Sequence, residues 1–377
     1  MKKKYIYFFV LIILVTILNS SCTNNQAINK SPEFTLVVID NEPESDDTTT
    51  KIDFKSQLIK SFEKLSKKND ISSEYVHLHS KNKNKAFFYL HKSITELLIK
   101  KTKVLFIYNF SEELNGVSTE LIKTLSEQYP QTTIITNLFS EDFQSNIVST
   151  VCNVDYAGIS LGYLTAYYID RQNAKEIPLS RSRTNPESLM SDLYDNEEKD
   201  NSIKSNDIKI AFFDNSETTK TSWYDPFIKG VTGYNELYLK NNIKVERFEL
   251  SKRFSFEQVS KIAQNAIKNG VEYFVISADY HSEDLLKICK DRRIKVIGTD
   301  LDFYFHYPFY QELVVISGIK DIEKIFTDIF ANIIEGNELP KVIKADSENN
   351  YVTVSEIHSF NFEMTEKIRN EIKNISQ

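Results

Sequence analysis

Acidic, amide and aromatic side chains follow several of the short hydrophobic segments in this 377-residue sequence. In a parallel α/β sheet the residues directly after the strands form the ligand-binding edge, so these side chains would lie close together. Carboxylates and amides hydrogen-bond to hydroxyl groups, and aromatic rings stack on flat rings. The pattern favours a site for a neutral, hydroxyl-rich ring compound, although acidic and Asn residues are also ordinary loop and helix-start residues. The candidates are Asp40, Asp47, Asn109, Phe110, Asp214, Tyr280, Asp300 and Asp302.

Two further aromatic candidates stand at a predicted boundary between a loop and a helix. Trp223 is the only tryptophan in the chain and precedes Tyr224-Asp225-Pro226-Phe227. Trp223 either lines a cleft or covers an edge of the core, and we include it with Phe227 among the candidate ligand contacts.

The motifs that carry catalysis in common enzyme classes are absent from the sequence. It contains no Gly-rich phosphate loop, no Gly-x-Ser-x-Gly, no His-Glu-x-x-His and no paired cysteines at zinc spacing. Asp300 and Asp302 are a carboxylate pair, but no third metal ligand is recognisable near them, so hydrogen bonding to a ligand is the preferred interpretation. We predict a protein that is not an enzyme and has no catalytic residues, no metal and no cofactor.

The amino terminus has the pattern of a bacterial lipoprotein leader. Three lysines at positions 2–4 precede an apolar run over residues 5–18, and small residues then lead to Cys22. The apolar run is shorter than the roughly 20 residues of a spanning helix. We predict a signal peptide over residues 1–22, acylation of Cys22 and a flexible tether over residues 23–33, with cleavage to a soluble protein as the alternative. The mature protein would be anchored to a membrane outside the cytoplasm, on the periplasmic face or at the cell surface.

Charge and cysteine content exclude two classes of protein. The formal net charge is −7, and loss of the three leader lysines makes the mature chain more negative, which argues against binding to nucleic acid. Only Cys152 and Cys289 follow Cys22, so no disulfide framework supports the fold. Both lie in apolar surroundings and are interpreted as buried inert thiols, with a single bridge as the alternative.

Short hydrophobic segments alternate with amphipathic ones from residue 34 onward, which is typical of an α/β fold with parallel sheets. We predict two lobes, each a parallel sheet flanked by helices, with the first formed by residues 34–153 plus 303–340 and the second by residues 154–302 plus 341–377. A polar insertion without large apolar residues covers residues 171–207. The predicted strands cover residues 35–39, 74–79, 104–108, 132–136, 147–151, 208–213, 273–277, 295–298 and 313–316. The predicted helices cover residues 54–67, 86–100, 118–129, 155–169, 226–239, 259–267, 283–291, 321–334 and 362–375.

Five stretches, in order along the chain, resemble the basic membrane protein family of bacterial lipoproteins. Proteins of that family have the type I periplasmic-binding-protein fold and deliver purine nucleosides to ABC transporters. Their order along most of residues 34–335 carries more weight than any one stretch. The stretches are Leu36-Val37-Val38-Ile39-Asp40 with Asp46-Asp47, Asn146 to Ser149 leading to Ala157 to Ala166, Ile210-Ala211-Phe212-Phe213 with Phe227-Ile228-Lys229-Gly230, Gly270 to Ile276 running to Val296 to Asp302, and Ile316-Ser317-Gly318-Ile319-Lys320.

The resemblance implies roles for three residues. Asp47 corresponds to an acidic ligand contact, Asp300 to a ribose-binding aspartate and Lys320 to a pocket lysine. Where the family has Ser-Phe-Asn after the acidic pair, this chain has Thr49-Thr50-Lys51, so the base-stacking aromatic is missing there and Phe110 or Tyr280 is the candidate in its place.

We therefore expect a substrate-binding protein of an ABC transporter. Its partners would be a nucleoside or sugar-like ligand, the permease subunits, and the membrane through its lipid anchor, but not nucleic acid. The alternative is a surface lipoprotein that keeps the fold, has lost the pocket and acts as an adhesin or host-interaction protein.

Overall fold

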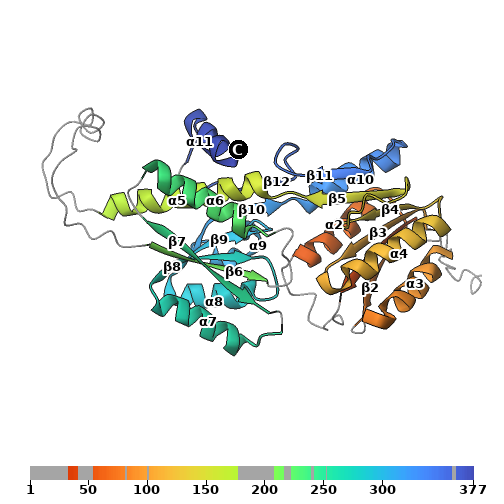
Figure 1. Cartoon of the computed structure of the whole chain (residues 1–377), viewed down its shortest axis with the longest axis horizontal. Coiled ribbons are helices and arrows are strands. Elements are labelled where there is room, and N and C mark those ends of the chain that lie inside the picture. Colours follow the sequence, from red (N-terminus) through yellow and green to blue (C-terminus); the bar gives the residue numbers. More distant parts are fainter. Residues whose placement is uncertain are drawn as a thin grey trace, which may run out of the picture.

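The computed structural model describes residues 33–40, 54–80, 83–99, 102–176, 208–215, 222–238, 242–251, 253–358 and 362–377. The predicted leader with Cys22, the tether, Asp47 and residues 177–207 of the predicted insertion lie outside the described residues. The described part of the chain forms two lobes, each built on one sheet, that lie side by side along the long axis of the molecule (Figure 1).

The first lobe is a six-stranded parallel sheet with helices on both faces. The strand order is β11-β5-β4-β3-β1-β2. The strands are β1 (Phe34–Asp40), β2 (Ser73–His79), β3 (Val104–Asn109), β4 (Thr133–Thr136), β5 (Ile147–Cys152) and β11 (Val342–Ala345). Helices α2 (Phe54–Lys68) and α10 (Ile322–Glu335) cover one face, and α3 (Lys83–Ile99) and α4 (Asn115–Gln128) cover the other.

The second lobe repeats this arrangement, with the order β12-β10-β9-β8-β6-β7. Its strands are parallel except for β12, which runs antiparallel to β10. The strands are β6 (Ile208–Asn215), β7 (Ile243–Leu250), β8 (Val271–Ser277), β9 (Lys295–Thr299), β10 (Val314–Lys320) and β12 (Val352–Val354). Helices α5 (Asp155–Glu176), α6 (Tyr224–Tyr238) and α11 (Glu366–Ser376) cover one face, α7 (Phe256–Lys268) and α8 (Ser282–Arg292) cover the other, and α9 (Phe303–His306) connects β9 to β10.

This architecture confirms the predicted fold class of two α/β lobes. The physical reason is visible in the central strands: all seven residues of β1 are buried, as in a parallel sheet covered on both faces. Helix α7 begins at Phe256, earlier than the predicted start at residue 259, because Ser255 and Gln258 form a capping box there.

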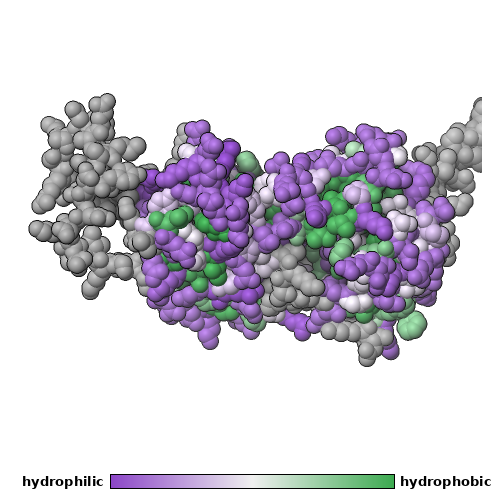
Figure 2. Space-filling model, turned by 45° about the horizontal axis from the view of Figure 1, so that its top comes forward, coloured by the Kyte–Doolittle hydropathy of each residue, from purple (hydrophilic) through white to green (hydrophobic). Residues whose placement is uncertain are grey.

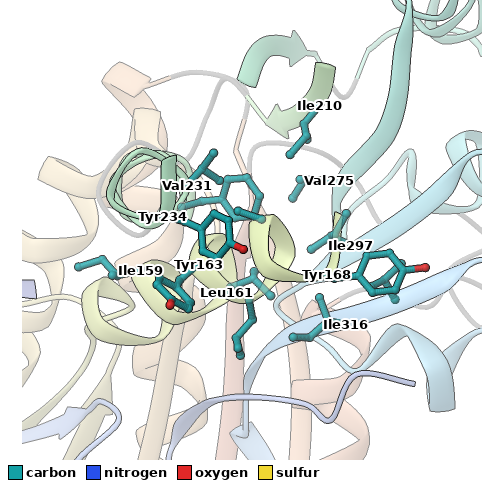
Figure 3. Close-up of a cluster of buried hydrophobic side chains, with 14 of the residues drawn as sticks. Ile159, Leu161, Tyr163, Tyr168, Ile210, Val231, Tyr234, Val275, Ile297 and Ile316 are labelled. Atoms are coloured by element: carbon teal, nitrogen blue, oxygen red, sulfur yellow. The ribbon is translucent and has the colours of Figure 1, made fainter. Parts of the chain in front are cut away.

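The core of the second lobe contains an unusually close contact between α5 and α6. Figure 3 shows this cluster, in which the Tyr163 and Tyr234 rings pack edge to face with centroids 5.2 Å apart. A Cβ atom at Gly162 would lie 2.0 Å from the Phe227 carbonyl oxygen, and one at Gly230 would lie 2.1 Å from the Ile159 carbonyl oxygen. The two glycines therefore let the helix backbones touch, which gives a structural role to two of the family-like stretches.

The predicted division of the chain between the lobes is wrong in two places. β10 lies within residues 303–340, which we assigned to the first lobe, but it pairs with β9 of the second sheet. β11 lies within residues 341–377, which we assigned to the second lobe, but it pairs with β5 of the first sheet. The described chain crosses between the sheets after β5, after β10 and after β11. Hydrophobic patterns predict strands but not the sheet that each strand joins, and this accounts for the error.

Three strands escaped prediction, and one helix was predicted too long. β7 alternates apolar with charged residues and lies at a sheet edge, where an exposed face needs no apolar run. β11 and β12 have only four and three residues. The last helix begins at Glu366 with Thr365 as its N-cap, instead of at residue 362.

On the face drawn in Figure 2 the described surface is mostly hydrophilic, with hydrophobic areas on both lobes. No helix among the described residues is long and apolar enough to cross a membrane.

Candidate functional site

The carboxyl ends of the strands of the two lobes come together at the seam between the lobes. In each sheet the strand order reverses direction once, between β1 and β3 and between β6 and β8, and ligands bind α/β sheets at such points. Tyr280, which follows β8, donates its hydroxyl to Asp40 Oδ2 at the end of β1 over 3.3 Å. The Phe54 amide at the start of α2 donates to the Ala278 carbonyl over 3.4 Å. The two sets of strand ends therefore face each other.

The most ordered polar cluster at this seam joins Asp300, Lys320 and Trp223. Lys320 Nζ lies 2.6 Å from Asp300 Oδ1, and Trp223 Nε1 donates to the same oxygen over 3.0 Å. The side chains of Lys320 and Asp300 are only 10% and 16% exposed. A buried ion pair with an additional hydrogen bond holds the carboxylate in a single orientation.

The backbone contributes to this orientation. Asp300 has φ 73°, in the left-handed region that costs energy for a residue other than glycine and that clusters at functional sites. The Lys320 amide donates to the Asp300 carbonyl over 3.0 Å and fixes this turn after β9. Asp300 is therefore held by both its main chain and its side chain.

The Trp223 ring packs directly against Gly318 of β10. A Cβ atom at Gly318 would lie 2.5 Å from the Trp223 ring, so the ring occupies the space that any larger residue would need. Trp223 is 2% exposed. Of the two interpretations of Trp223, the structure supports the core-edge position, from which the indole positions Asp300.

Burial and charge set the protonation of the cluster. Burial, the largest single effect, lowers the pKa of Lys320, but the Asp300 carboxylate together with smaller contributions from Cys152 and Asp214 outweighs it and raises that pKa above its ordinary value. Burial raises the pKa of the Cys152 thiol, which the nearby Lys320 partly offsets. Burial also raises the pKa of Asp214, although Ser222 and Arg247 bind its carboxylate at 2.8 Å each. The cluster therefore combines a charged lysine with a neutral thiol.

A second polar cluster crosses the seam. Lys55 in the first turn of α2 lies 3.2 Å from Asp40 Oδ2, and the Asp40 side chain is 2% exposed. The Tyr280 ring lies under Lys55 Nζ, 5.9 Å from the ring centroid, while its hydroxyl reaches Asp40. Two residues of the first lobe and one of the second thus share this cluster.

Phe54 connects the two clusters. It packs against hydrophobic residues of both lobes, and its ring centroid lies 5.9 Å from Lys320 Nζ. Phe54 is not among the candidate contacts, because most of those follow predicted strands and Phe54 begins a helix. The amphipathic pattern that predicted this helix was the signal by which Phe54 could have been found.

Other predicted site residues have local structural partners. Asn109 donates to the Ser111 carbonyl at 2.8 Å and to Asn115 Oδ1 at 2.6 Å, so its amide shapes the turn after β3. Phe110 packs against the core of the first lobe. Phe227 is fully buried against Phe212, which is the position of a core residue.

Asp302 also has a local role, because its carboxylate accepts from the Tyr304 amide and caps α9. Its carboxylate lies 3.6 Å from His358 Nε2. Asp300 and Asp302 therefore do not act as a pair.

The two cysteines are free. Cys152 ends β5 in the first lobe, while Cys289 is buried in α8 of the second, where burial raises its thiol pKa. The alternative of a bridge between them is therefore wrong.

Within the described ranges, no group of three His, Cys, Asp or Glu side chains is arranged to hold a metal ion. A pocket of about 230 Å³ lies between residues 139–149 and Lys341 with Val342, and none of the candidate ligand contacts lines it.

Comparison with solved structures identifies the class of fold. The chain is similar to a transcriptional activator of the comK gene from Bacillus halodurans, with a TM-score of 0.58 at 14% identity, covering 91% of this chain and 96% of that one. It is similar to an ABC transporter solute-binding protein from Aeropyrum pernix K1, with a TM-score of 0.61 at 12% identity, covering 86% and 77%. The chain is also similar to a sugar transporter from Clostridium phytofermentans, with a TM-score of 0.53 at 11% identity, covering 85% of this chain and 98% of that one.

The chain therefore has the two-lobed α/β fold of type I periplasmic binding proteins. No family model and no curated protein matches the sequence. Membership of the basic membrane protein family accordingly stays a prediction from the resemblance.

Proposed function

We propose that this protein is a lipid-anchored substrate-binding protein of an ABC transporter that captures a small polar ligand between its lobes. The observation that carries the proposal is Asp300, which is held in a strained left-handed conformation by Lys320 and Trp223 at strand ends that face the other lobe. Strain of this kind is retained where a carboxylate must point in a defined direction. The similarity in fold to ABC solute-binding proteins supports the same role.

The chemistry of the seam suits a neutral ring compound with hydroxyl groups, such as a purine nucleoside or a sugar. Asp300 would accept from ligand hydroxyls through its free lone pairs, and Lys320 would donate to a ring or hydroxyl oxygen. Phe54 would take the place of the missing stacking aromatic, and Tyr280 of the second lobe is a further aromatic at the seam. Asp47 keeps its predicted role as a ligand contact.

Capture and release would occur by hinge closure, which is the usual motion of two-lobed binding proteins. The three crossings of the described chain between the sheets form the hinge. They are tied together, because the Asn153 amide donates to the Ala345 carbonyl and the Asp321 amide donates to the Tyr351 carbonyl, both over 2.8 Å. Capture and transfer to permease subunits require no catalysis. Acylation of Cys22 would keep the protein at a membrane outside the cytoplasm.

Trp223 provides a direct test, because it is the only tryptophan and touches Asp300. The full chain is titrated with a panel of nucleosides and sugars while its tryptophan fluorescence and thermal unfolding are followed. A ligand at about 100 times its dissociation constant stabilises the folded state by roughly 2.7 kcal/mol. Asp300→Ala is expected to weaken that ligand at least about tenfold, equivalent to roughly 1.4 kcal/mol. Asp142→Ala, which removes an exposed carboxylate paired with Lys123 of α4, serves as the matched control.

The second candidate is a surface lipoprotein of the same fold whose pocket is lost, acting as an adhesin or host-interaction protein. The observation in its favour is that Asp300 is already bound by Lys320 and Trp223. Fold alone does not decide between the two, since one similar structure is a transcriptional activator of the comK gene. Absence of any fluorescence or thermal response to the whole panel would reject the transport proposal in favour of this one.

A further inference from the structure

Within the part of the chain that the structure describes, Tyr280 and Phe54 make contacts between the lobes. Tyr280 contributes two of them, a hydrogen bond to Asp40 and a ring contact with Lys55. Phe54 contributes the others, a backbone hydrogen bond to Ala278 and a ring contact with Lys320. Figure 1 shows α2, which carries Phe54 and Lys55, at the side of the first lobe next to the second.

The contact made by Tyr280 is built from buried charge. Asp40 and Lys55 are 2% and 15% exposed, and they already belong to one lobe, where β1 and α2 hold them. A preformed ion pair of this kind loses little side-chain freedom when a third group binds it. Tyr280 offers both a hydroxyl for the carboxylate and a ring face for the ammonium group.

We infer that Asp40, Lys55 and Tyr280 form a latch that holds the two lobes closed in the absence of ligand. Opening of the lobes separates Tyr280 from the ion pair, so the latch favours the closed state through contacts that the open state lacks. A ligand then enters by competing with the latch or by using the fraction of open molecules. The inference goes beyond the proposed function and also holds if the protein is not a transporter subunit.

The experiment measures the distance between the lobes by energy transfer between two dyes. Cysteines introduced by Glu127→Cys on α4 and Lys261→Cys on α7 place one exposed label on each lobe. The full chain without these substitutions measures background labelling of its own cysteines, Cys22, Cys152 and Cys289. Any bound compound is removed beforehand by unfolding in urea, dialysis and refolding.

The latch predicts high transfer efficiency for the stripped protein, with a lower mean efficiency in Tyr280→Ala and in Lys55→Met. Tyr280→Phe keeps the ring and loses the hydroxyl, so its efficiency should lie between those of the parent and Tyr280→Ala. Lys64→Met, a lysine on the same helix in an exposed ion pair with Glu323, should leave the efficiency unchanged.

Two results would overturn the latch. One is a stripped parent protein that is already open, which would mean that only a ligand closes the lobes. The other is a Tyr280→Ala variant with the same efficiency as its parent. Circular dichroism of each variant ensures that only folded protein is compared. Neither outcome depends on which ligand binds, so failure of the latch is distinguishable from failure of the proposed function.

Discussion

Each lobe carries a buried ion pair at its strand ends, and the two pairs differ in what surrounds them. Asp300 follows β9 and Lys320 ends the neighbouring strand β10 of the same sheet. Their third partner, Trp223, belongs to the same lobe. Asp40 and Lys55 also belong to one lobe, but their third partner, Tyr280, comes from the other.

The first ion pair has all three partners within one lobe, whereas the second depends on the position of the other lobe. We call the first the fixed pair. The Asp300–Lys320 pair keeps these partners whether the lobes are open or closed, so it can present an oriented carboxylate before a ligand arrives. The Asp40–Lys55 pair has its tyrosine only when the lobes are closed.

Removal of the cation from the fixed pair should have the largest effect. Lys320→Met leaves the buried Asp300 carboxylate without its partner, which costs about 3–5 kcal/mol of folding free energy. Urea unfolding followed by circular dichroism measures the loss. The double variant Asp300→Asn with Lys320→Met should recover much of it, because no unpaired charge remains. A loss below about 1 kcal/mol in the single variant would show that the pair is not buried in solution.

A smaller effect is expected from moving the indole without touching either charge. Gly318→Ala places a Cβ atom within 2.5 Å of the Trp223 ring, and such overpacking costs about 1–3 kcal/mol. Displacement of Trp223 should also change its fluorescence spectrum. Gly116→Ala, where an added Cβ meets no atom within 4 Å, is the matched control. Equal stability of the two variants would contradict the seat that we assign to Trp223.

At alkaline pH the Asp300–Lys320 pair should make a smaller contribution to stability. Only the difference between the pKa of Lys320 in the folded and in the unfolded chain enters this contribution. Asp300 raises the pKa of Lys320 above its ordinary value of 10.5 against the opposing effect of burial. A lysine with the higher pKa in the folded state stabilises fully below about pH 10.5, and the contribution disappears as pH rises through the folded value. Denaturant unfolding at about pH 9 and about pH 11.5 should show a steeper fall for the parent than for Lys320→Met. Parallel curves would contradict the raised pKa.

Loss of an exposed pair sets the lower end of the scale. Lys103 and Glu33 are 71% and 43% exposed, and pairs of this kind contribute little because water and salt screen them. Lys103→Ala is therefore expected to change the unfolding free energy by no more than about 1 kcal/mol. The loss of unfolding free energy is measured by urea unfolding, as for Lys320→Met. A larger loss would mean that burial does not explain why the Lys103–Glu33 pair contributes less than the Asp300–Lys320 pair.

Local patterns in the sequence predicted most of the helices and central strands, because burial on both faces demands apolar runs such as the one in β1. They missed β7 because this edge strand mixes charged with apolar residues and therefore lacks an apolar run. Among the candidate site residues, the structure brings Asp300, Lys320 and Trp223 into contact. It assigns Asn109 to a turn and Phe227 to the core. Polar residues after strands satisfy turns and caps as readily as ligands, and sequence position alone does not distinguish these uses.

The sequence by itself determined the class of fold, since hydrophobic periodicity and turn residues act within short segments. Only the tertiary structure decided which sheet β10 and β11 join and which lobe supplies the third partner of each ion pair. Phe54 and Lys55 belong to the seam only because α2 begins next to Ala278 and Tyr280, which follow β8 of the other lobe. These contacts join residues more than 200 positions apart, and their geometry depends on the packing of whole sheets and helices. Neither local propensity nor spacing along the chain contains that information.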